Sequence, residues 1–152
     1  MFRIREADAK DIPAIVAMIA NDPLGQLREE VLDPLPQTYI EAFERIMADH
    51  NQELVVLENA RGEIRATLQL SFIQYLTYKG GIRAQIEAVR VHEDSRGTGI
   101  GRFLLEWAIN RSRERGAHMV QLTTDKKRPA ALKFYERLGF KPTHEGMKLH
   151  LP

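Results

Sequence analysis

Apolar residues along the chain follow two spacings, one typical of strands and one typical of helices. Leu68, Leu70 and Phe72 alternate with polar neighbours, as in a strand that buries one face. Glycine-containing turns separate several of these runs, which predicts hairpins between neighbouring strands. The expected strands are residues 2–7, 53–59, 63–76, 82–91, 118–124 and 144–151, with a further short strand near Phe140.

Other segments repeat apolar residues every three or four positions, which predicts helices. The clearest stripe consists of Ile100, Phe103, Leu104 and Trp107. Asp8 is placed to cap the N-terminus of an earlier helix. The four expected helices are one that follows Asp8, one at residues 39–50, one from Ile100 to Gly116 and one within residues 128–140.

The order of these segments predicts an α+β (α/β) fold. An antiparallel series of strands leads into a strand–helix–strand crossover, so we expect a mixed, mostly antiparallel twisted sheet. About six to seven strands would form this sheet, flanked by about four helices. No repeat or long linker divides the chain, and we expect residues 1–152 to form a single domain.

Composition narrows the class of protein. The chain has 152 residues, of which 43% are hydrophobic and 28% charged, as in an ordinary soluble globular protein. A formal net charge of +1 argues against a nucleic-acid partner. The absence of cysteine excludes disulfides, thiolate metal sites and a cysteine nucleophile. The five histidines lack metal-ligand spacing, so we expect no metal, and without a signal peptide or membrane span we expect a cytoplasmic protein.

The segment SRGTGIGRFLLEWAI, residues 95–109, places three glycines directly before a helix. Such loops hold phosphates, because free N–H groups and the positive end of the helix dipole converge there. The nucleotide P-loop requires Gly-Lys-Ser/Thr, and the dinucleotide fingerprint requires G-x-G-x-x-G; neither matches G-x-G-x-G followed by Arg-Phe. The alternative is a plain strand-to-helix turn, although such a turn needs only one glycine.

Two segments in this order resemble the GNAT superfamily of acyl-CoA-dependent N-acyltransferases. AVRVHEDSRGTGIGRFLLEWA, residues 88–108, resembles that family's coenzyme A pyrophosphate loop with its preceding strand. RPAALKFYERLGF, residues 128–140, resembles its second signature, and the strand HMVQLTT lies between the two. The resemblance covers nearly the whole chain and is closest to small-molecule members such as aminoalkylphosphonate and aminoglycoside acetyltransferases. It implies a GNAT-like fold and an N-acetyltransferase that uses acetyl-CoA as cosubstrate.

The resemblance also implies a set of cofactor contacts. The backbone of Gly97 to Gly101 would hold the pyrophosphate with Arg102 close by, while Arg96 would add charge or fix the loop. The strand before the loop would bind the pantetheine arm through its main chain, although its valines suit a core equally well. Arg128 stands where the family frequently has asparagine, so its role is open. The expected cofactor residues are Val89, Arg90, Val91, Arg96, Gly97, Thr98, Gly99, Ile100, Gly101, Arg102, Arg128, Ala131 and Phe134.

Glu87 is a candidate general base. We expect it to share a strand face with Val89 and Val91, and carboxylates are rarely buried without a partner or a task. Partial burial would raise its pKa toward the range in which it could take a proton from an ammonium group. Related members often have a glutamate here. The structural alternative is an ion pair with Arg83 or Arg65 on a neighbouring strand.

Tyr135 is a candidate general acid. From spacing alone it is a core residue, because Ala131, Phe134 and Leu138 complete a helical stripe with it. The resemblance implies instead that its hydroxyl protonates the leaving thiolate, which a phenol of pKa near 10 can do.

The expected reaction is direct attack of a primary amine, which we expect to be a small molecule, on acetyl-CoA within a ternary complex. Backbone near Val89 would stabilise the oxyanion. We expect the acceptor near residues 24–39 and 72–81, which otherwise are ordinary solvated loops. The candidate acceptor residues there are the acids Glu29, Glu30 and Asp33 and the aromatics Tyr39, Tyr75 and Tyr78.

Two other functions remain open from the sequence. One is a non-catalytic acyl-CoA-sensing or regulatory module, which would bind the cofactor without transfer. The other is a DNA-binding regulator, against which the lack of a basic recognition helix argues. We expect no nucleic-acid or membrane partner. A homodimer is a further expectation, which rests only on the frequency of two-fold dimers.

Overall fold

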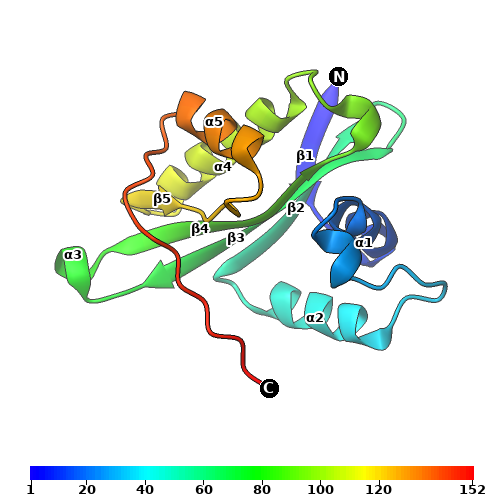
Figure 1. Cartoon of the computed structure of the whole chain (residues 1–152), viewed down its shortest axis with the longest axis horizontal. Helices are drawn as coiled ribbons and strands as arrows, with labels where there is room; N and C mark the ends of the chain where they lie inside the picture. Colours follow the sequence, from blue (N-terminus) through cyan, green and yellow to red (C-terminus); the bar gives the residue numbers. More distant parts are fainter.

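A computed structural model describes residues 1–152 as one twisted sheet with helices on both faces (Figure 1). The strand order is β1-β2-β3-β4-β5. Neighbours from β1 to β4 are antiparallel, and β5 runs parallel to β4, which confirms the expected mixed, mostly antiparallel α+β fold. The strands are β1 (Phe2–Glu6), β2 (Gln52–Asn59), β3 (Ile64–Gln74), β4 (Ile82–Val91) and β5 (Met119–Gln121).

Helices α1 and α2 lie on one face of the sheet, and α4 and α5 lie on the other (Figure 1). The four expected helices are present, and a single helical turn, α3, is added at the tip of the β3–β4 hairpin. No helix has both the length and the apolar character that crossing a membrane requires. The helices are α1 (Ile12–Ala20), α2 (Gln37–Ala48), α3 (Thr77–Gly80), α4 (Ile100–Glu114) and α5 (Pro129–Arg137).

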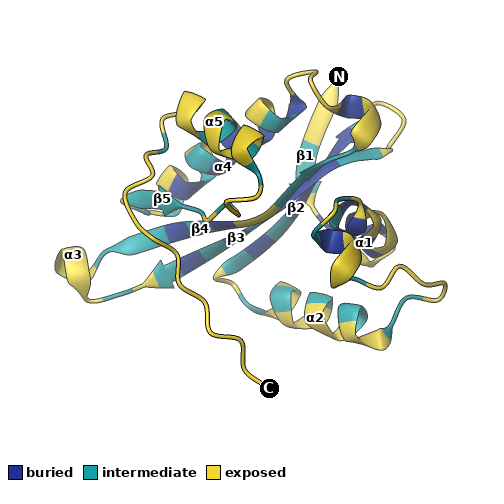
Figure 2. Ribbon diagram, viewed as in Figure 1, coloured by how far each residue is buried: buried dark blue, intermediate teal, exposed yellow.

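The main hydrophobic core lies between the sheet and α4. Leu68 and Leu70 of β3 and Leu104 and Leu105 of α4 have no exposed surface. Figure 2 shows this buried band running along the central strands, with exposed residues on the outer helix surfaces. The alternation in β3 and the stripe in α4 therefore meet in one core, as their sequence spacing predicts.

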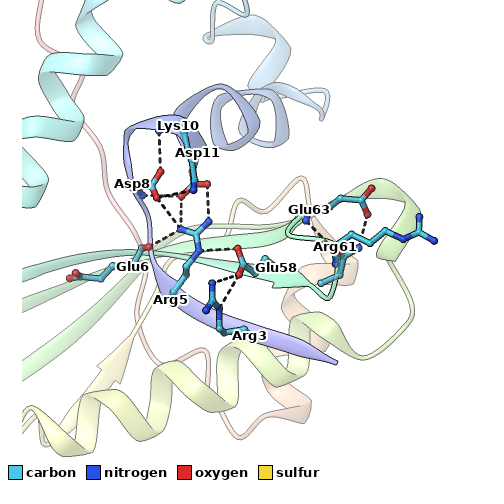
Figure 3. Close-up of polar contacts among 10 residues, drawn as sticks. Arg3, Arg5, Glu6, Asp8, Lys10, Asp11, Glu58, Arg61 and Glu63 are labelled. Carbon is cyan, nitrogen blue, oxygen red and sulfur yellow. Dashed lines mark hydrogen bonds and ion pairs between the residues drawn. The ribbon is translucent and has the colours of Figure 1, made fainter.

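An ion-pair network fixes the start of α1 to the sheet edge (Figure 3). Arg5 of β1 donates to both carboxylate oxygens of Asp11, at 2.7 and 3.0 Å, and to Oε2 of Glu58 at 2.9 Å. Arg3 also pairs with Glu58. Asp8 caps the 3₁₀ turn Ala9–Asp11 that leads into α1, since its carboxylate accepts the Lys10 N–H. The network is charge-balanced and structural.

The expected strands near Phe140 and at residues 144–151 are absent, so the sheet has five strands and not six or seven. The Phe140 N–H instead donates to the Tyr135 carbonyl in the turn that ends α5. Alternation alone does not make a strand, because a strand needs a neighbour to complete its hydrogen bonds. Within one chain, no neighbouring strand lies beside residues 144–151.

Candidate active site

Strands β4 and β5 separate soon after they meet. Only Arg83–Gln85 pair with Met119–Gln121. Beyond Gln85, the β4 edge that faces away from β3 has no strand beside it. An extended ligand could therefore bind the backbone of residues 86–91 as a further strand would.

A β-bulge interrupts β4 at the same place. The register with β3 shifts between Thr67 and Gln69, so Leu68 lies opposite both Ala88 and Val89. Ala88 has a φ of 53°, a left-handed conformation that an alanine rarely adopts. Bulges of this kind redirect side chains and often occur beside active sites.

The bulge corrects the prediction for Glu87. Val89 and Val91 pack against the core on the α4 side, whereas Glu87 is exposed on the opposite face of β4. Its one side-chain hydrogen bond, 3.4 Å long, comes from the glutamine two residues earlier. Arg65 and Arg83, the alternative partners, form no ion pair with it. Glu87 is thus a free carboxylate on the face that α1 and α2 cover.

The loop between β4 and α4 presents a row of free backbone donors. None of the N–H groups of residues 97–102 donates to a protein acceptor. Gly97 and Gly99 adopt φ values of 75° and 87°, which favour glycine, and Gly99 directly precedes the 15-residue helix α4. Free N–H groups at the positive end of a helix dipole bind phosphates, so this loop suits the coenzyme A pyrophosphate.

The third glycine of the loop has a different role. Gly101 lies in the first turn of α4, and a Cβ there would be 3.5 Å from Phe134 and from Val91, an ordinary contact. The two loop arginines are only partly available, because Arg102 pairs with Glu106 at 2.7 Å. Arg96 is exposed and makes a long contact of 3.4 Å with a strand carbonyl.

The position of Tyr135 is compatible with both of its predicted roles. Its ring packs edge-on against Phe134 and Phe140, with centroids 5.3 and 5.9 Å away, so it does contribute to the core. Its hydroxyl makes no hydrogen bond to a protein group. Burial raises the pKa of the Tyr135 phenol above its ordinary value, and the positive charges of Arg90 and Arg128 oppose this shift. The phenol is therefore protonated at neutral pH and free to donate.

A charged cluster beside Tyr135 contains a residue that the sequence did not single out. Asp22, just after α1, lies 3.1 Å from Arg90 Nε of β4 and 3.1 Å from Arg128 Nη2 before α5. Burial alone would raise the pKa of Asp22, but the Gly25 N–H and the two guanidinium groups lower it below its ordinary value. Arg128, whose role was open, thus bridges two distant segments. No local sequence pattern predicts a role for Asp22, because both of its arginine partners lie in the other half of the chain.

An apolar pocket of about 120 Å³ lies between α1, α2 and the sheet. It reaches the bulge at Ala88, and Tyr39 of α2 forms part of its wall. The Tyr39 hydroxyl donates to Glu29, so this expected acid is already engaged. Tyr75 and Tyr78 do not line the pocket. Their rings pack against His118 beside α3, at the far end of the β3–β4 hairpin (Figure 1).

Comparison with known proteins gives one consistent group of relatives. A family model described as "Acetyltransferase (GNAT) family" matches residues 17–140. The L-methionine sulfoximine/L-methionine sulfone acetyltransferase of Pseudomonas aeruginosa is 30% identical over 90% of this chain and 78% of its own. The aminoalkylphosphonate N-acetyltransferase of Salmonella typhimurium is 30% identical over 93% and 86%. A crystal structure described as a transcriptional regulator from Bacillus halodurans is 52% identical, with a TM-score of 0.96 over 99% of this chain and 100% of that one.

Proposed function

This chain belongs to the GNAT acetyltransferase family, and we propose that it transfers an acetyl group from acetyl-CoA to a small primary amine. The observation that carries this proposal is the bulge at Ala88. On one side of the bulge lie the free edge of β4 and the phosphate-binding loop. On the other side lie the apolar pocket and the free carboxylate of Glu87. Donor and acceptor would meet at this point of the strand.

The mechanism follows from the groups placed there. Glu87 takes a proton from the ammonium form of the acceptor, directly or through water. The amine nitrogen attacks the thioester carbon, forming the C–N bond, while backbone near Val89 stabilises the negative oxygen. The C–S bond then breaks, and the phenol of Tyr135 gives its proton to the leaving thiolate. The resulting phenolate takes the second proton of the positively charged nitrogen, which leaves a neutral amide, and Glu87 releases its proton to water.

The test is a transfer assay with acetyl-CoA and a panel of small primary amines. We expect an N-acetylated product by mass spectrometry, with one free thiol released for each product molecule. The thiol must not appear when the amine is omitted, which separates transfer from hydrolysis. Tight binding of acetyl-CoA without product from any amine would contradict the proposal.

That contradicting result would favour the alternative of a regulatory acyl-CoA sensor. The relative from Bacillus halodurans that is described as a transcriptional regulator is the observation in its favour. The free hydroxyl of Tyr135 beside the open β4 edge favours the enzyme, because a sensor has no need of a proton donor there.

The exposed apolar residues of the C-terminal segment suggest a protein partner, and a second copy of this chain would suit them. Met147, Leu149 and Leu151 lie on one face of an extended segment and are 93, 87 and 84% exposed. Exposed apolar residues in strand alternation mark an interaction surface. We propose that this segment pairs with an open sheet edge of a second copy, in a two-fold dimer.

A further inference from the structure

We propose that the acceptor is an amino acid whose carboxylate binds between Arg90 and Arg128 and whose apolar side chain fills the pocket beside Ala88. This inference rests on the proposed function, because it assigns a chemical class to the acceptor of the same reaction.

The cluster around Asp22 has more positive than negative charge. Arg90 and Arg128 share the single carboxylate of Asp22. Its Oδ1 accepts the Arg128 guanidinium and two backbone N–H groups, whereas its Oδ2 faces Arg90 Nε without a hydrogen bond. The other nearby cation, Arg28, is already neutralised by Glu29 at 3.0 Å. One guanidinium charge is therefore left without a counter-charge.

Arg90 also has an unmet hydrogen-bonding requirement. Its side chain is only 14% exposed, and its Nε is buried without a hydrogen-bond acceptor. Asp22 Oδ2 lies 3.1 Å from this Nε, and neither atom makes a hydrogen bond. Burial lowers the pKa of Arg90, and the like charge of Arg128 adds to this effect. A bound anion would offset the repulsion between the two guanidinium groups.

The position of the cluster assigns it to the acceptor and not to coenzyme A. The phosphate-binding loop leads into α4, whereas Arg90 points to the face of the sheet that α1 covers. Arg90 lies opposite Thr67 on β3, and Thr67 and Ala88 both line the pocket. The charges of Arg90 and Arg128 both act on the phenol of Tyr135, so the anion would lie beside the reacting groups.

The pocket sets the size of the rest of the acceptor. Its wall consists mainly of isoleucine, valine and aromatic side chains of α1 and α2. A dry cavity of about 150 Å³ holds a benzene molecule, so a volume of about 120 Å³ suits a leucine-sized group. The acceptor amine would carry an apolar group that fills the pocket and a carboxylate that binds the two arginines. A medium-sized α-amino acid has both groups.

The structural alternative is that Asp22 and the two arginines only hold the segment after α1 against the sheet. The two accounts differ in how ligand charge affects binding. We would titrate the protein, saturated with coenzyme A, with N-acetyl-L-leucine and with its neutral carboxamide, using calorimetry. Transfer to L-leucine, L-leucinamide and 2-aminoethylphosphonate would be measured in parallel.

We expect the carboxylate to bind about 10- to 100-fold more tightly than the amide, since hydrogen bonds to charged groups are the strong ones. Arg128→Gln, at the more exposed of the two arginines, should remove most of this preference by raising KM for the amino acid. KM for L-leucinamide should rise much less than KM for L-leucine in this variant. Arg45→Gln, on the outer surface of α2, is the matched control and should keep the preference.

The outcomes separate this inference from the proposed function. Equal affinity for carboxylate and amide, or binding of neither, overturns the carboxylate subsite. Transfer to neutral amines in that case leaves the proposed function standing. Tighter binding of the carboxylate that depends on Arg128, without transfer to any amine, supports the subsite and contradicts the proposed function. Preference for the phosphonate over the amino acid would overturn the assignment of a carboxylate.

Discussion

Arg90 Nε lies 3.1 Å from Asp22 Oδ2, and this ion pair joins strand β4 to the segment just after α1. Both side chains are largely buried. Asp22 therefore supports the site in two ways: it orients Arg90, and it holds the segment that follows α1 over the sheet.

Replacing Asp22 by asparagine should destabilise the protein by about 2 to 4 kcal/mol, because it leaves two guanidinium groups without their carboxylate. The pKa of Asp22 is lower in the folded protein than its ordinary value of about 3.9. The stabilisation is therefore complete above about pH 5 and is lost as the pH falls through the folded pKa. Urea unfolding of wild type and Asp22→Asn from pH 7 to pH 3 measures this. A difference in stability that stays constant over the whole range would contradict the assigned ion pair.

Tyr135→Phe should lower kcat by about 10²- to 10⁴-fold, because it removes the proton donor for the thiolate. The affinity for acetyl-CoA should not change, since the ring still packs. Because burial raises the pKa of Tyr135 above its ordinary value, wild type should show no loss of kcat from this group at neutral or mildly alkaline pH. Steady-state kinetics with Tyr78→Phe as the control, at the exposed tip of the hairpin, tests this. Unchanged turnover in Tyr135→Phe would exclude the acid role.

Glu87→Gln should lower kcat/KM at neutral pH, because the acceptor ammonium loses its base. Part of the lost rate should return at higher pH, where more of the amine is already deprotonated. The measurement is a pH–rate profile beside that of Glu44→Gln, an exposed α2 variant. An unaltered rate with the same pH dependence as wild type would leave Glu87 without a catalytic role.

The exposed C-terminal segment predicts a concentration-dependent dimer. Leu149→Asp should shift the protein toward monomer in sedimentation experiments, because it places a charge on the apolar face of the segment. His150→Asp, on the opposite face of the same extended segment, should keep the dimer. A wild type that stays monomeric throughout the micromolar range would show that this segment does not pair with a second copy.

Local sequence patterns predicted most of the helices and strands, but not the contacts between residues that are distant in the sequence. The expected limits of residues 82–91 coincide with β4, because alternation is a property of the strand itself. The face of Glu87 was predicted wrongly, because the bulge arises from pairing with β3, where one residue, Leu68, meets two. Asp22 was missed for the same kind of reason, since its two arginines lie 68 and 106 residues later in the sequence.

The backbone of the glycine loop before α4 agrees well with the sequence analysis. Its three glycines suggested close approach of a ligand; Gly97 and Gly99 adopt positive φ values, whereas Gly101 packs beside Phe134 and Val91, and phosphate binding by the loop stays a prediction. The C-terminal segment was the least successful prediction. Its apolar alternation is typical of a strand, but the chain holds no neighbour for it.

The most direct test of the account is thermal unfolding with and without acetyl-CoA, in wild type, Gly99→Glu and Gly101→Ala. At 100 times its dissociation constant a ligand stabilises by about 2.7 kcal/mol, which shifts Tm by roughly 5 to 10 °C in a domain of this size. We predict this shift in wild type and in Gly101→Ala, where a Cβ fits. It should vanish in Gly99→Glu, which places a carboxylate where the phosphates bind. A folded wild type that shows no shift, or an equal shift in Gly99→Glu, would contradict acetyl-CoA binding at this loop.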